Sequence, residues 1–169
     1  AWALWSAACG EAVSTPSAPG YVQLHEALLE RSCASASCHG GPIAMVNLRF
    51  DDPEETFAHL INGEPVSAAA REAGLRLVVP GDPSRSLLYR KLADSAETLA
   101  AEGLGDPMPL AQPPVGDDAV DAVRAWIEAG APYEGAPVTI APATAPGDDA
   151  HYVACEATDE LGLRACLGD

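Results

Sequence analysis

The sequence predicts an all-α fold, because three kinds of pattern in it are typical of helices. Leu24, Leu28 and Leu29 follow Tyr21 at helical spacing, which indicates a helix running up to the cysteine-rich stretch. Asp-Pro pairs at 52–53 and 82–83 are typical of helix starts. Their aspartate acts as N-cap and their proline takes the first helical position.

The two Asp-Pro helices differ in length. The first has an acidic first turn and is expected to end near Asn62-Gly63. The second is expected to run through about Ala93, because Leu88 and Leu92 lie one turn apart.

A third pattern predicts the final helix, after an irregular stretch. Glycine and proline interrupt the segment 102–114 throughout, so no regular element is expected there. The following helix is expected to begin at a cap, Asp117 or Asp118, and to end at Gly130. One face carries its apolar residues, Val120, Val123, Trp126 and Ile127.

Composition divides the chain into a domain over 21–131 and three flanking parts. Residues 1–20 are similar to the end of a bacterial lipoprotein signal followed by a tether, with Cys9 as the lipid-modified residue. Residues 132–150 are rich in Pro, Ala, Thr and Gly and indicate a linker.

The terminal segment 151–169 contains Cys155 and Cys166, which an oxidising compartment would pair in a disulfide. If Cys9 carries no lipid, it is free to pair with either of them, and the sequence leaves this choice open.

The chain is strongly acidic, with 25 acidic against 9 basic residues and a formal net charge of -16. Nucleic acid is therefore excluded as a partner, because neutralising phosphates requires clustered lysine and arginine. A protein with a basic docking face suits this surface better. No stretch is long and apolar enough to span a bilayer, so membrane contact is expected only through a lipid on Cys9.

The stretch SCASASCHGG places Cys38 directly before His39 and separates Cys38 from Cys33 by four small residues. A second cysteine followed at once by histidine is the constant part of a covalent haem site, where thiols attach the porphyrin and imidazole ligates the iron. The first cysteine only has to reach back, so a small-residue bulge is compatible with attachment. A zinc site and a disulfide are the alternatives.

Met108 is the predicted ligand on the opposite side of the iron, because Pro107 and Pro109 stiffen a loop that presents its sulfur. Met45 is expected in the core. His59 is the alternative ligand, ahead of His25 and His151, which are expected to be ordinary histidines.

Four pieces in this order resemble class I cytochromes c, and more closely the small cytochrome c domains of planctomycete and myxobacterial envelope proteins. They are the Cys33–His39 motif, the stretch PGDPSRSLLY at 80–89, Met108-Pro109 and the WIEAGA stretch at 126–131. The resemblance implies that the first and last helices cross, with one haem c in the cleft between them. By analogy, Arg76 is a partner for a haem propionate.

The function expected from these features is electron transfer by a monohaem cytochrome in the bacterial periplasm or outer envelope. No nucleophile with a paired base, second haem motif or nucleotide loop is apparent, so an electron carrier is expected rather than an enzyme. The alternatives are a haem subunit of a larger assembly and a haem-based ligand sensor.

Overall fold

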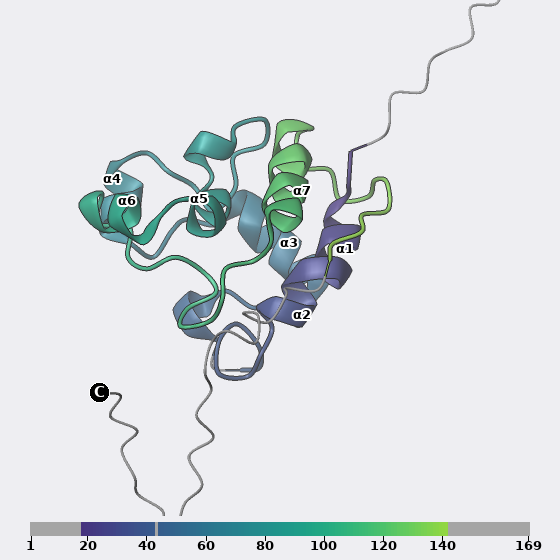
Figure 1. Cartoon of the computed structure of the whole chain (residues 1–169), viewed down its shortest axis with the longest axis horizontal. Helices are drawn as coiled ribbons and strands as arrows, with labels where there is room; N and C mark the ends of the chain where they lie inside the picture. The colour runs from purple at the N-terminus through teal and green to yellow at the C-terminus, as the bar shows by residue number, and fades with distance from the viewer. Residues whose placement is uncertain (1–17, 43, 142–169) are drawn as a thin grey trace, which may run out of the picture.

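A computed structural model describes residues 18–42 and 44–141. Helices and irregular segments make up this part of the chain (Figure 1). Within it, the only β-type pairings are two isolated bridges, Pro19 with Ala136 and Arg76 with Ser86. The all-α prediction is therefore confirmed. The predictions for Cys9, His151, Cys155 and Cys166 lie outside the described residues.

The predicted first helix is confirmed and consists of three consecutive parts. α1 (Tyr21–Leu24) continues into a π-helical turn, η1 (His25–Leu29), and then into α2 (Glu30–Ser32). The widened turn buries His25 together with Leu28 and Leu29. Nothing in the spacing of the leucines predicts this change of helical pitch, since they lie on one face in either form.

α3 (Pro53–Asn62) begins and ends as predicted. The Asp52 carboxylate accepts a hydrogen bond of 2.9 Å from the Glu55 amide, and Pro53 takes the first helical position. Gly63 caps the C-terminal end.

The single helix predicted from Asp82 to Ala93 is wrong, because Ser86 divides it. Asp82 caps only a 3₁₀ turn, η3 (Pro83–Arg85), and the α-helix that follows is α5 (Leu87–Ala93). Ser86 is extended and fully buried, and its hydroxyl accepts from the Val79 amide and donates to the Asp82 carbonyl, each at 2.8 Å. These tertiary hydrogen bonds outweigh the local preference for a continuous helix.

Three short helices were not predicted: η2 (Met45–Asn47), α4 (Ala68–Glu72) and α6 (Ala96–Ala101). Ser67 and Ser95 cap α4 and α6, so serine before an alanine-rich run was the available signal. α4 and α6 lie side by side in Figure 1. They share a small second core of Ala70, Leu75, Leu99 and Leu104.

The predicted final helix is α7 (Asp117–Glu128), but its cap is different. Gly116 is the N-cap residue, and neither Asp117 nor Asp118 caps the helix. Asp118 accepts instead from the backbone amide of Ala141, at 2.6 Å. Gly130 follows the helix with φ +93°, a conformation that glycine adopts without strain, so the predicted end is confirmed.

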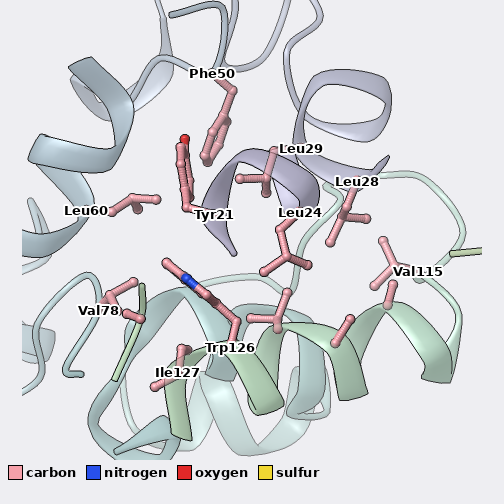
Figure 2. Packing of buried hydrophobic residues seen from close by; sticks show 14 residues of the cluster. Tyr21, Leu24, Leu28, Leu29, Phe50, Leu60, Val78, Val115, Trp126 and Ile127 are labelled. Atoms are coloured by element: carbon pink, nitrogen blue, oxygen red, sulfur yellow. The ribbon is translucent and has the colours of Figure 1, made fainter. Parts of the chain in front are cut away.

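The main core lies where α1, η1 and α7 meet (Figure 2). Tyr21 and Trp126 are both buried, with ring centroids 5.8 Å apart, and they connect the first helix to the last. Burial of aromatic side chains of this size makes them the largest apolar contributors to such a core. α7 also packs against α5.

Residues 132–141, assigned to a linker from composition, pack against this core. The Tyr21 amide and the Trp126 indole N–H both donate to the Pro132 carbonyl, each at 2.9 Å. Tyr133 and Ile140 contact the core cluster as well. The compact unit therefore extends beyond Ala131.

Candidate functional site

An apolar cavity of about 330 Å³ lies beside the main core and brings together the residues predicted to bind the cofactor. Its volume is within the range usual for small-molecule sites. Four predicted residues line it: Cys33, Cys38, His39 and Met108. Met108 lies about 70 residues further along the chain than the cysteine motif. Folding of the chain therefore brings Met108 and the motif to the same cavity.

The loop from Cys33 to Gly40 is a compact turn closed by its own backbone. The Ser35 carbonyl accepts from the Cys38 and Gly40 amides at 3.0 and 2.9 Å, and the Cys33 carbonyl accepts from the His39 amide at 3.2 Å. Ser35 and Ala36 are exposed and point away from the cavity lining, while both cysteines stay at the cavity. The spacing of four residues is therefore accommodated locally.

Gly40 is required for the closure of this turn. A Cβ atom at that position would collide with the backbone carbonyl of Ala34. The close approach of two backbone segments explains why glycine follows the histidine.

His39 is held by the irregular segment that precedes α3. Its ring Nδ1 lies 2.9 Å from the Leu48 carbonyl oxygen, and because a carbonyl only accepts, Nδ1 carries the proton. The lone pair is then on Nε2, the nitrogen that is free to bind a metal. Phe50 packs edge-on against the imidazole, with centroids 5.3 Å apart, and donates its amide to the His39 carbonyl at 2.7 Å.

The two thiols of the motif are free and differ in environment. Cys33 packs against the main core, and burial raises the pKa of its thiol to about 11. Hydrogen bonding from Ser35 and Ser37 holds the pKa of Cys38 below its ordinary value. Cys38 is therefore the thiol that ionises first.

Met108 lies between two cavities. It is half-buried and lines the cavity described above, and together with Pro109 it also lines a second cavity of about 400 Å³ on the side of α7. The peptide bond between these two residues is cis.

Met45 is not a core residue, so that prediction is wrong. It is 48% exposed and lies at the cavity, with its amide donating to the Cys38 carbonyl at 2.8 Å. The reason is the short distance in sequence from His39, which keeps η2 at the edge of the cavity.

The described histidines have different roles. His59 lines the cavity, and its ring lies against the backbone of Gly63. His25 is buried away from the cavity and donates from Nε2 to the Phe50 carbonyl at 2.7 Å, which fits the expected hydrogen-bonded histidine.

Arg76 makes protein contacts outside the cavity lining. Its guanidinium donates to the Asn62 carbonyl at 3.2 Å and lies 3.6 Å from the Glu64 carboxylate. Glu64 and Lys91 are the only acidic or basic residues, histidine aside, that line the cavity. Neither was predicted as a site residue, although Lys91 stands out in the sequence as the only lysine of the chain.

The mouth of the cavity is hydrophobic. Four large hydrophobic side chains stand out as exposed in the described part of the chain, and all four line the cavity: Met45, Val46, Val66 and Leu110. Grouping of this kind is typical of a binding surface.

No family model matches the sequence, and no curated protein or solved structure matches it either. Within residues 18–42 and 44–141, no helix is long and apolar enough to cross a membrane. In the same residues, no three side chains among His, Cys, Asp and Glu are grouped in a way that would hold a metal ion.

Proposed function

We propose that the protein is a monohaem c-type cytochrome that carries electrons in the bacterial cell envelope. The observation that carries this proposal is the shared cavity of Cys33, Cys38, His39 and Met108. These are the two thiols, the imidazole and the thioether that a class I site requires, from opposite ends of the domain.

The residues at the cavity fit a haem group in their chemistry as well as in their position. Cys33 and Cys38 would hold the porphyrin through thioethers, and His39 would ligate the iron through Nε2, the nitrogen left free by the bond to Leu48. Met108 would be the second axial ligand, with His59 as the alternative at the same cavity. Bound there, haem iron supplies reversible one-electron exchange between Fe(II) and Fe(III).

The remaining side chains favour a mostly apolar occupant. Most of the cavity lining is hydrophobic, and the exposed Met45, Val46, Val66 and Leu110 at its mouth would be partly covered by such a group. Covering them removes apolar surface from water, which favours the bound state by about 25 cal/mol per Å².

The partner and the location belong to the same proposal. The net charge of -16 favours a redox partner with a basic docking face. The signal-like start of the sequence, with Cys9, favours the periplasm or the outer envelope and a lipid anchor. Electron exchange with a small cationic oxidant should slow as salt is raised, because the attraction is screened.

The decisive experiment combines a reduced pyridine haemochrome spectrum with the intact mass of the unfolded chain. We expect the mass to include one haem and the spectrum to be that of a haem with both vinyl groups saturated. One remaining vinyl would mean that only one cysteine is attached. A chain mass without haem would exclude the proposal.

A ligand-sensing haem protein is the second candidate, and the position of Met108 between two cavities favours it. Carbon monoxide distinguishes the two functions. An electron carrier with Met108 bound should keep a six-coordinate, low-spin spectrum when CO is added, whereas a sensor should bind CO rapidly.

A further inference from the structure

Lys91 is the only lysine of the chain, and it lies on α5 with its side chain lining the cavity. The ion pairs of the described residues are all made by arginines. The Lys91 ammonium instead donates to the backbone carbonyl of Asp106, at 2.6 Å.

Lys91 makes a second hydrogen bond, through its own backbone, to the segment that contains Asp106. The Met108 amide donates to the Lys91 carbonyl at 2.8 Å. One residue of α5 therefore contacts the segment at two points, at Met108 itself and two residues before it.

Gly105 lies beside the lysine side chain and has a backbone conformation that favours glycine. It has φ +78°, and a Cβ atom there would be 3.4 Å from the Lys91 Nζ.

Apart from Val115, which is buried in the main core, little else fixes the segment 105–115 in place. Its only hydrogen bonds to other described residues are the two made by Lys91. The prolines at 107, 109, 113 and 114 have no amide hydrogen to donate. Packing is also incomplete, because Met108 and Pro109 face a cavity on each side.

We propose that Lys91 is the positioning residue that holds the Met108 thioether at the cavity. It does so through its side-chain bond to the Asp106 carbonyl and its backbone bond to the Met108 amide. The proposal rests on the proposed function, in which Met108 is an axial ligand of haem iron. The side-chain bond restrains Asp106, and Pro107 transmits this restraint to Met108 because its ring fixes one backbone torsion.

The experiment compares Lys91→Leu, Lys91→Gln and Lys91→Arg with the wild type, all as haem-loaded protein. Leucine removes the donor and suits the apolar lining. Glutamine keeps a polar group but its side chain is one atom shorter, and it provides a second test if K91L does not fold. Arginine restores a cation that reaches the carbonyl. Arg124→Leu is the matched control, because it removes an exposed cation on α7 whose bond is to Asp121.

Three measurements are made on each variant: intact mass, the charge-transfer band of methionine-ligated ferric haem, and amide hydrogen exchange of residues 105–111. In K91L and K91Q we expect haem to be attached, exchange to be about tenfold faster, and the methionine band to be reduced. K91R should restore both signals, and R124L should match the wild type.

Wild-type exchange and an undiminished methionine band in K91L or K91Q would overturn the role of Lys91. The same changes in R124L would also overturn it, since they would then follow from loss of charge alone. A wild-type chain without haem mass would instead overturn the proposed function, and with it the role of Lys91 toward iron.

Discussion

The imidazole of His39 donates to the carbonyl of Leu48 at 2.9 Å. The imidazole of His25 donates to the carbonyl of Phe50, two residues after Leu48, at 2.7 Å. Between them, the Thr56 hydroxyl donates to the carbonyl of Arg49. Three successive carbonyls that belong to no regular element are thus satisfied by side chains, and His39 is oriented by one of them.

The two histidines should respond differently to substitution. His39→Ala should remove iron ligation and destabilise the fold less than His25→Ala, because its bond to the Leu48 carbonyl is only part-buried. His25→Ala should keep the ligation but lower the free energy of unfolding by about 1–3 kcal/mol, because it leaves a buried carbonyl without a donor. Visible spectra and denaturant unfolding measure the two effects. The reverse pattern would contradict the assignment of His39.

Met108→Ala should lower the reduction potential and change the axial ligation, because a thioether ligand favours the reduced iron. Met45→Ala is the matched control, since the only other methionine of the chain lines the same cavity but lies close to the motif. Redox titration with spectral detection measures both. Unchanged values in M108A would assign the second axial position to His59.

Gly40→Ala should destabilise the attachment loop more than Gly41→Ala. The methyl group at position 40 would collide with the Ala34 carbonyl, whereas position 41 has open space and only an unfavourable φ of +72°. The strain at position 41 costs about 1–2 kcal/mol. The yield of covalently attached haem and the unfolding free energy measure both variants, and equal losses would show that the close contact is not limiting.

The two thiols should react at different rates in chain produced without haem. Near pH 8, Cys38 should be alkylated faster than Cys33, because hydrogen bonding lowers the pKa of Cys38 whereas burial raises that of Cys33 to about 11. The difference should disappear in denaturant. Mass spectrometry of Cys33→Ser and Cys38→Ser variants identifies each site, and equal rates in the folded chain would contradict the prediction.

Acid should weaken the ion pair that connects α5 to α6. Arg90 makes a bidentate bond to Glu102 at 2.8 and 2.9 Å, and this bond holds the pKa of Glu102 below its ordinary value. A carboxylate with a lowered pKa in the folded state adds stability above its unfolded pKa and loses it as the pH falls.

Glu102→Gln should therefore melt at a lower temperature than the wild type at pH 7, and the difference should shrink as the pH drops below about 4.5. Glu97→Gln is a suitable control, since Glu97 lies on α6 and makes no ion pair among the described residues. A melting difference that does not depend on pH would show that the charge of Glu102 is not involved.

Much of the fold and the candidate site could be predicted from local patterns. The Asp52-Pro53 start, the end at Gly130 and the apolar face of α7 depend on neighbouring residues, and the structure agrees with them. The cavity likewise contains the motif cysteines, His39 and Met108, which were chosen for their chemistry.

The remainder depends on hydrogen bonds that no local pattern marks. Ser86 interrupts a helix because its hydroxyl bonds to Val79 and Asp82, and the acceptor for His39 is a backbone carbonyl that no residue type marks. Lys91 reaches the Met108 segment only after α5 and that segment have come together. Tertiary hydrogen bonding of this kind has no signature in a single sequence.

The hydrophobic mouth of the cavity has a consequence for the life of the protein before it is functional. Met45, Val46, Val66 and Leu110 are exposed at this mouth. Under the proposed function, a chain that has not yet received haem would present an apolar surface of the kind that drives aggregation. Attachment of haem would cover part of this surface, so aggregation should be confined to chains that lack the cofactor.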